Sequence, residues 1–238
     1  MRVDSKQHVC IGSKSWTTPR MMSCALKCGA GSRTWTRRNP AVGERLGVLG
    51  GTFDPIHCGH VLLALSVREL LDLDRILFIP AADPPHKRSD EITDAIHRWR
   101  MVELALEGLD VLQPSRLEID RGGTSYTVET LRHLRSDHDG AELHLIIGAD
   151  NVCDLSTWHD PEGILQIARV VAGARRQSGV RDDDRFADRI IHLDTPLFEV
   201  SSTTVRQRLR NHQPIRYLVP PSVESYILDN GLYGTGDS

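Results

Sequence analysis

The sequence predicts an α/β protein with a doubly wound, Rossmann-like parallel sheet that carries helices on both faces. Two observations support this fold class: short apolar runs alternate with longer segments of helical spacing from residue 45 onward, and turns rich in glycine or proline close the runs. Repeated strand–helix–strand units favour parallel strands joined by right-handed crossovers. A chain of 238 residues, 39% hydrophobic and 26% charged, suits one such domain.

The first predicted unit contains the most informative segment of the chain. A strand at 46–49 runs into GGTFDPIHCGH at 50–60, and a helix at 61–71 follows. The two glycines would let the backbone approach a bulky anion, and a helix N-terminus offers unpaired N–H groups to it. His57 and His60, three positions apart, should lie on one face of the first helical turn. The segment therefore predicts a site for a phosphate chain.

The rest of the chain continues the alternation. Short apolar runs bounded by polar, glycine or proline residues predict strands, and apolar residues that recur every three or four positions predict helices. Because ligands bind beyond the carboxyl ends of parallel strands, the segments that follow the strands should form the site. In chain order the expected elements are a strand at 75–80, a helix at 93–109 capped by Thr93 and ended by Gly108, a strand at 111–120, a helix at 125–134, strands at 143–147, 169–172 and 190–193, and helices at 202–209 and 222–228.

The first 44 residues differ from the remainder, and we expect residues 45–238 to form a single catalytic domain. Residues 1–45 hold nine Lys or Arg against two acidic residues, whereas the rest of the chain holds 20 basic and 30 acidic residues. No hydrophobic periodicity marks the basic segment, which we interpret as a disordered or wrongly translated leader. A transit peptide, or a small metal site built from its cysteines, is the alternative.

Four later segments place chemically useful residues next to predicted turns. The rigid turn 84–88 fits an anion site or a solvated loop. The helix start within 123–131 offers N–H groups that its own hydroxyls would cap or that would hold a ligand carboxylate. The small turn at 148–151 admits a nucleobase, and Trp158 would stack on an aromatic ring or pack half-buried. The hydroxyl-rich helix start at 200–206 ends with an arginine. A positive charge in the first turns is unfavourable beside the positive end of the helix dipole, so this arginine predicts a bound anion.

Together these segments resemble the nicotinate-nucleotide adenylyltransferases, a branch of the HxGH nucleotidyltransferases. The resemblance covers about residues 45–233 and rests on GGTFDPIHCGH, PPHK, GTSYTVETL, IIGADNVCDLSTW, VSSTTVR and YLVPPSVESYI. One departure is the segment 173–176, Gly-Ala-Arg-Arg, where the family more often has Arg-Pro-Gly. The resemblance implies transfer of the adenylyl group of ATP to nicotinate mononucleotide, giving deamido-NAD and pyrophosphate in NAD biosynthesis.

The resemblance also implies a role for each site residue, with His57 and His60 as the catalytic pair. Because the acceptor phosphate is already anionic, in-line positioning and charge neutralisation would replace a general base, and Mg²⁺ would accompany ATP. ATP would be bound by Gly50, Gly51, Thr52, Phe53, His57, His60, Gly148, Asp150, Ser202, Thr203 and Arg206. The mononucleotide would be bound by Asp54, Lys87, Ser125, Tyr126, Thr127 and Trp158, and Asp54 would also order the glycine turn.

Other interpretations stay open at this level. A pantetheine-phosphate adenylyltransferase or a cytidylyltransferase shares the first motif, and a non-catalytic nucleotide-binding protein could keep the fold. The expected partners are the two small-molecule substrates, with no nucleic acid and no membrane, although the basic leader would be the place for a nucleic-acid contact. No stretch approaches the roughly 18 apolar residues of a membrane span. A homo-oligomer is compatible with the sequence, and the low cysteine content of the body fits the cytoplasm.

Overall fold

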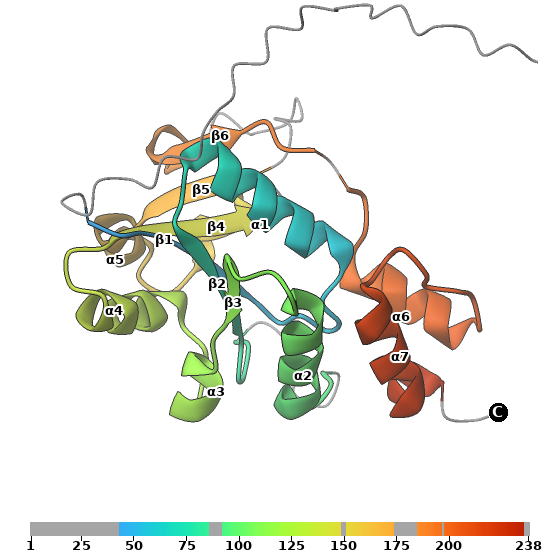
Figure 1. The fold of residues 1–238 in the computed structure, drawn as a ribbon. Coiled ribbons are helices and arrows are strands. Elements are labelled where there is room, and N and C mark those ends of the chain that lie inside the picture. Colours follow the sequence, from blue (N-terminus) through green and yellow to red (C-terminus); the bar gives the residue numbers. More distant parts are fainter. Residues whose placement is uncertain (1–42, 86–91, 149–150, 174–184, 197, 236–238) are drawn as a thin grey trace, which may run out of the picture. The chain divides into compact units, whose positions relative to one another are not determined.

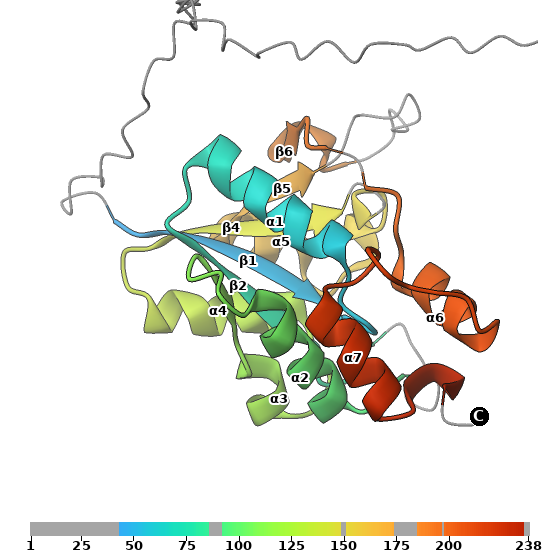
Figure 2. The same ribbon diagram turned by 45° about the vertical axis from the view of Figure 1, so that its right-hand side comes forward.

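The computed structural model describes residues 43–85, 92–148, 151–173, 185–196 and 198–235 (Figures 1 and 2). Its centre is a six-stranded parallel sheet with the strand order β3-β2-β1-β4-β5-β6. The order reverses direction between β1 and β4, which makes the carboxyl ends of these strands the expected place for a ligand. The predicted fold class is confirmed. The strands are β1 Arg45–Gly51, β2 Arg75–Pro80, β3 Leu112–Pro114, β4 Glu142–Gly148, β5 Arg169–Gly173 and β6 Ile190–Leu193.

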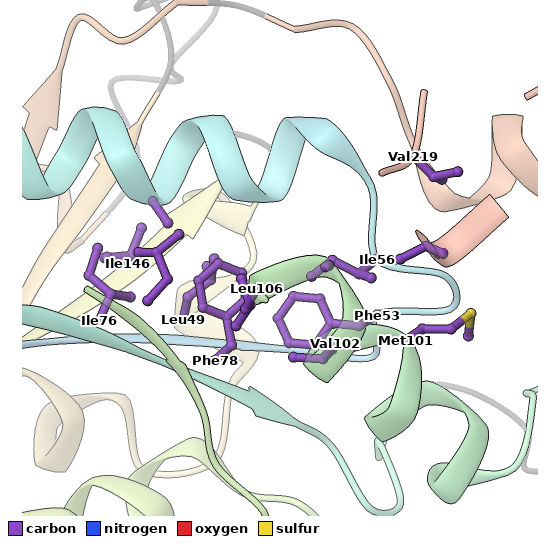
Figure 3. Packing of buried hydrophobic residues seen from close by; sticks show 14 of the residues in the cluster. Leu49, Phe53, Ile56, Ile76, Phe78, Met101, Val102, Leu106, Ile146 and Val219 are labelled. Carbon is purple, nitrogen blue, oxygen red and sulfur yellow. The ribbon is translucent and has the colours of Figure 1, made fainter. Parts of the chain in front are cut away.

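Helices cover both faces of the sheet, and successive side chains of each strand enter different cores. In β1, Leu46 and Val48 belong to one core, whereas Leu49 belongs to the other, which is shown in Figure 3. Burial on both faces explains why the strands read as continuous apolar runs in the sequence. The core of Figure 3 is covered by α1 Cys58–Leu71, α2 Ala95–Leu106, α6 Ser202–Arg210 and α7 Pro221–Asp229, and the opposite core by α4 Thr127–Asp137 and α5 Pro161–Ile167.

The strand predicted at 111–120 is wrong beyond residue 114. β3 pairs with β2 over three residues only, ending where Phe78 lies opposite Pro114. Proline cannot donate a ladder hydrogen bond, which suits the end of an edge strand. The short helix α3, Leu117–Arg121, follows, and an ion pair of 3.0 Å joins Arg116 to Asp120 at i,i+4 spacing.

Two helix starts also differ from prediction. Asp94, not Thr93, caps α2, because its carboxylate accepts the Ile96 N–H at 2.7 Å. Helix α5 is not among the predicted elements, although Asp160, which accepts the Gly163 N–H at 3.0 Å, and the following proline are typical start signals. Across the described ranges, no helix is both long and apolar enough to cross a membrane.

Candidate active site

A cleft of about 1790 Å³ opens at the carboxyl ends of the central strands. β1 and β4 contribute Gly50 and Gly148 to it, and the first turns of α1, α4 and α6 line its walls. Drug-sized ligands typically occupy about 300–1,000 Å³, so this cleft has room for two substrates bound side by side.

Most of the predicted site residues come together in this cleft. Asp54 is the exception, because it is buried and lies outside the lining. Lys87 and Asp150, also predicted, lie outside the described residues. The predicted residues that line the cleft are Gly50, Gly51, Thr52, Phe53, His57, His60, Ser125, Tyr126, Thr127, Gly148, Trp158, Ser202, Thr203 and Arg206.

The glycine turn exposes its backbone to the cleft. No atom of the residues that the structure describes lies within 4 Å of the position that a Cβ at Gly50 would occupy, so the described part of the chain leaves the main chain open to a ligand there. At Gly51 a Cβ would lie 3.2 Å from the ring of Phe53. That ring is only 2% exposed and packs between Phe78, at 5.7 Å between ring centroids, and His60, at 5.1 Å. The side chain of Phe53 therefore supports His60 from within the core.

The two histidines stack on each other at the start of α1. His57 is the N-cap residue, and the ring centroids of His57 and His60 lie 3.6 Å apart with 23° between the planes. The His57 N–H donates to Nδ1 of His60 at 3.2 Å. Because Nδ1 of His60 accepts this bond, the ring proton of His60 is on Nε2. The prediction that both side chains share one face of the first turn is confirmed.

His57 is neutral at physiological pH. Its side chain is 7% exposed, and desolvation by burial lowers the pKa of His57 from 6.5 to about 4. Its Nδ1 is buried without a hydrogen-bond partner among the described residues. Gly59 permits this position of the ring, because a Cβ there would lie 3.0 Å from Nδ1 of His57. The glycine of the motif is therefore needed for histidine placement.

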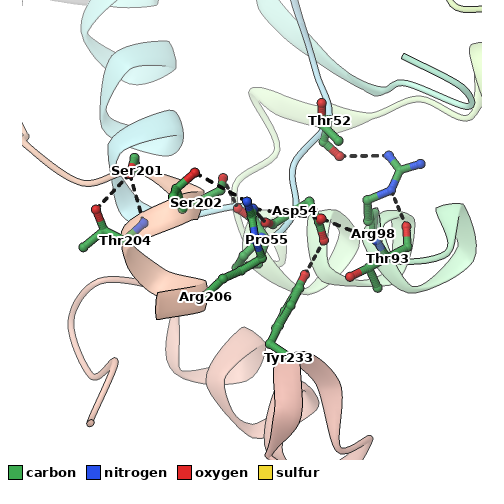
Figure 4. A network of polar contacts seen from close by, with 11 residues as sticks. Thr52, Asp54, Pro55, Thr93, Arg98, Ser201, Ser202, Thr204, Arg206 and Tyr233 are labelled. Atoms are coloured by element: carbon green, nitrogen blue, oxygen red, sulfur yellow. Dashed lines mark hydrogen bonds and ion pairs between the residues drawn. The ribbon is translucent and has the colours of Figure 1, made fainter. Parts of the chain in front are cut away.

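Asp54 links the glycine turn to other segments of the chain through a network of polar contacts (Figure 4). Its Oδ1 accepts the Tyr233 hydroxyl at 2.6 Å, and its Oδ2 accepts the Thr93 N–H at 3.4 Å. Burial, and then the charge of Asp54, raise the pKa of Tyr233 well above its ordinary value, so its hydroxyl stays a donor. Arg206 donates to the Asp54 carbonyl and lies 4.0 Å from Oδ2. In this structure the Asp54 carboxylate is occupied by side chains and main chain of the protein.

The start of α6 is tied to the same turn. Ser201 is its N-cap residue and accepts the Thr204 N–H at 3.0 Å. The Ser202 hydroxyl donates to the Pro55 carbonyl at 2.8 Å. Thr203 is exposed in the cleft, and the first-turn N–H groups of α6 point beyond the helix end as such groups do. Arg206, expected to need an anion, thus already has the Asp54 carbonyl as a partner.

Arg98, a buried arginine outside every motif of the sequence analysis, connects the glycine turn to the loop after β2. Arg98, on α2, is 1% exposed and donates to the carbonyls of Thr93 at 2.8 Å, Thr52 at 2.8 Å, Ala81 at 2.7 Å and Ala82 at 3.2 Å. Burial lowers the pKa of its guanidinium, and the charge of Asp54 opposes that shift.

The signal for this arginine was its place in the helical pattern. The buried positions of α2 are 98, 101, 102, 105 and 106, which share one face, whereas the apolar residue Ile96 is 53% exposed. A charged residue in register with an apolar face indicates a buried polar role.

The opposite wall of the cleft is built around the start of α4. Ser125 does not cap this helix; its Oγ accepts the Ala82 N–H at 2.9 Å and its N–H donates to the Asp83 carbonyl at 2.9 Å. The N-cap residue is Tyr126, whose side chain makes no capping bond. The side chain of Tyr126 therefore caps none of the first-turn N–H groups of α4.

An indole stands near this uncapped helix start. Trp158 is half-buried, packs against the core beneath α4 and α5, and lines the cleft. The rings of Tyr126 and His159 lie 4.4 Å apart between centroids, which adds an aromatic surface to the same wall. The wall thus combines an anion-favouring helix start with flat apolar groups.

A doubly wound sheet that carries a glycine turn, stacked histidines and two helix starts in one cleft defines the class: this is a nucleotidyltransferase. Residues 48–208 match the cytidylyltransferase-like family. A probable nicotinate-nucleotide adenylyltransferase of Thermomicrobium roseum is 41% identical over 200 residues, covering 81% of this chain and 92% of that protein. This chain therefore belongs to the cytidylyltransferase-like family, within its nicotinate-nucleotide adenylyltransferase branch.

Further similarities agree with this placement. A probable nicotinate-nucleotide adenylyltransferase of Geobacillus kaustophilus is 41% identical over 190 residues, covering 80% of this chain and 86% of that protein. The structure of Plasmodium falciparum nicotinic acid mononucleotide adenylyltransferase complexed with NaAD superposes with a TM-score of 0.69, covering 82% of this chain and 100% of that one. At 18% identity this second likeness supports the fold.

Proposed function

We infer that this protein transfers the adenylyl group of ATP to nicotinate mononucleotide, giving deamido-NAD and pyrophosphate in NAD biosynthesis. One observation carries the inference: a single cleft holds the stacked histidines at a glycine turn on one side and an uncapped helix start beside an indole on the other. The first side suits a triphosphate and the second an aromatic ring with a carboxylate. Relatives about 40% identical, including those of Thermomicrobium and Geobacillus, are named for this activity.

On the ATP side, the reaction needs positioned donors. A bond forms between a 5′-phosphate oxygen of the mononucleotide and the α-phosphorus, and the bond from the α-phosphorus to the bridging oxygen of the pyrophosphate breaks. The attacking oxygen is already anionic, so no proton has to be removed. Nε2–H of His60 would donate to the phosphate, while His57 and the N–H groups of Ser202 and Thr203 would hold the chain in line.

On the acceptor side, recognition would depend on charge and ring shape. The Thr127 N–H and the helix dipole behind it would bind the nicotinate carboxylate. Trp158 would stack on the pyridine ring. Stacking of this kind does not distinguish a carboxylate substituent from an amide. Tyr126 and Ser125 would shape the wall, Ser125 through its bonds to the loop after β2.

Mg²⁺ would enter with ATP. Within the described ranges no group of three or more His, Cys, Asp or Glu side chains is arranged for a metal ion. Mg²⁺ commonly binds substrate phosphates and keeps several waters, so the triphosphate itself would hold it. When bound, it would neutralise charge on the phosphates.

The domain organisation and location belong to the same proposal. Residues 1–44 would be a leader that the catalytic domain, 45–238, does not need for activity, and the enzyme would act in the cytoplasm. The two described cysteines, Cys58 and Cys153, are free thiols, which fits a reducing compartment.

The test is a substrate panel. Purified protein is mixed with ATP, Mg²⁺ and one of three acceptors, nicotinate mononucleotide, nicotinamide mononucleotide or pantetheine phosphate, and pyrophosphate release is followed. A hydrogen bond to a charged group contributes about 1.5–3 kcal/mol, so we expect kcat/KM to favour the acid at least about tenfold. The amide NH₂ would also face a donor and leave it unpaired. Equal use of the two mononucleotides would refute the carboxylate site, and use of pantetheine phosphate instead would refute the function.

A further inference from the structure

The guanidinium of Arg98 hydrogen-bonds both to the glycine turn and to the loop after β2. Thr52, whose carbonyl it binds, belongs to the glycine turn on the ATP side. Ala81 and Ala82, whose carbonyls it also binds, begin the loop after β2. Thr93, its fourth partner, precedes α2 and donates its own N–H to Asp54 (Figure 4). One buried side chain thus holds three separate segments of main chain.

The loop after β2 carries this connection to the acceptor side. The Ala82 N–H donates to Ser125 Oγ, and the Ser125 N–H donates back to the Asp83 carbonyl. Asp83 and Thr124 form an isolated parallel bridge just before the start of α4. A continuous series of hydrogen bonds therefore runs from the glycine turn, through Arg98 and this loop, to the helix start proposed to bind nicotinate.

We propose that Arg98 is a positioning residue that fixes the acceptor wall of the cleft relative to the glycine turn; the inference rests on the proposed function. Every hydrogen bond that the structure gives the Arg98 side chain goes to a main-chain carbonyl, so its bonds set backbone positions. A guanidinium presents five donors in a rigid plane, whereas a lysine ammonium is a point with three. In-line transfer is sensitive to placement, and an error of about 1 Å is worth roughly 10²-fold in rate.

The decisive variant is Arg98→Lys, which keeps the charge and loses the planar fork. We expect the KM for nicotinate mononucleotide to rise at least about tenfold, and kcat/KM to fall about 10²-fold. The KM for ATP should change less, because the histidines and α6 also contact that substrate. Arg98→Gln, which keeps a single amide NH₂ as donor, is the second variant. Circular dichroism first establishes which variants are folded, and kinetics are compared among those.

Arg75→Lys is the matched control. Arg75 lies at the other end of β2, pairs with Glu44 at 2.7 Å and Gln113 at 2.9 Å, and is not among the cleft-lining residues. The Arg75→Lys variant should shift the midpoint of urea unfolding. It should leave the KM for ATP and the KM for nicotinate mononucleotide within about twofold of wild type, as expected for a change distant from the site.

The outcomes separate positioning from stability. Unchanged KM values in a folded Arg98→Lys protein, with kcat reduced only in proportion to the folded fraction, would overturn the inference. So would an equal rise in KM for both substrates, or failure of both Arg98 variants to fold, since each indicates a purely structural arginine. Failure of the proposed function is a different result, because it would appear in the wild type as no pyrophosphate release with nicotinate mononucleotide.

Discussion

Lowering the pH should destabilise the protein through His57. Burial lowers the pKa of this ring from 6.5 to about 4 in the folded state, whereas the unfolded chain keeps the ordinary value. Between these two values the unfolded state binds a proton that the folded state does not. The stability present above pH 6.5 is therefore lost as the pH falls toward 4. A full shift of this size is worth about 3.4 kcal/mol, and the part lost between pH 7 and pH 5 is about 2 kcal/mol.

The assay is urea unfolding of wild type and of His57→Asn at pH 7 and pH 5, followed by circular dichroism. Wild type should lose about 2 kcal/mol more than the variant over this interval, seen as a larger drop in the unfolding midpoint. His144 is also buried with a lowered pKa, chiefly through desolvation, so His144→Gln serves as the control for a second titrating ring. The same loss in wild type and His57→Asn would show that His57 does not carry the effect.

Four further predictions address catalysis, stability, recognition and the domain boundary. His60→Ala should fold like wild type and lose about 10²-fold in kcat, and a loss below threefold in a pyrophosphate assay would contradict its role. Tyr233→Phe should cost about 1.5–3 kcal/mol in urea unfolding, because a bond to a buried carboxylate is lost; an unchanged midpoint would argue against it. Trp158→Ala should raise the KM of both mononucleotides while their ratio, measured in parallel, stays within about threefold. A chain that starts at Gly43 should stay soluble and active, whereas one that starts at Arg45 should be less stable in thermal unfolding, because Glu44 pairs with the body at 2.7 Å; inactivity of the Gly43 chain would show that the leader is needed.

The alternation of strands and helices was readable from the sequence because each strand is buried on both faces. Residues 76–79 form a continuous apolar run, and 143–147 form an apolar run interrupted only by the buried His144; the structure places both within the central sheet. The glycine turn and the histidine pair were readable for a different reason, since their geometry is local. Spacing of i,i+3 fixes the shared face of His57 and His60 without reference to the rest of the fold.

The hydrogen bonds that hold the site residues in place could not be predicted from the sequence in the same way. Asp54 was expected to order the glycine turn and to bind substrate, but its partners, Tyr233 and Arg206, lie 179 and 152 residues away along the chain and could not be named from the local sequence. Ser125 was expected to cap a helix or contact a ligand, but its hydroxyl binds the loop after β2. A short polar side chain has several local hydrogen-bonding options, and tertiary packing selects among them. Local patterns therefore predicted which segments meet in the cleft better than which atoms are bonded there.

The protonation state of the histidines determines how they can assist transfer. A neutral His57 can stack 3.6 Å from His60 at no cost of a buried charge, which an imidazolium there would incur. In the proposed reaction the pair would act through oriented N–H dipoles, with Nε2–H of His60 fixed as a donor by the bond to its Nδ1. A fixed donor would gain strength as negative charge develops on the phosphate. Its contribution is therefore larger in the transition state than in bound ATP, so His60→Ala should lower kcat far more than it raises the KM for ATP.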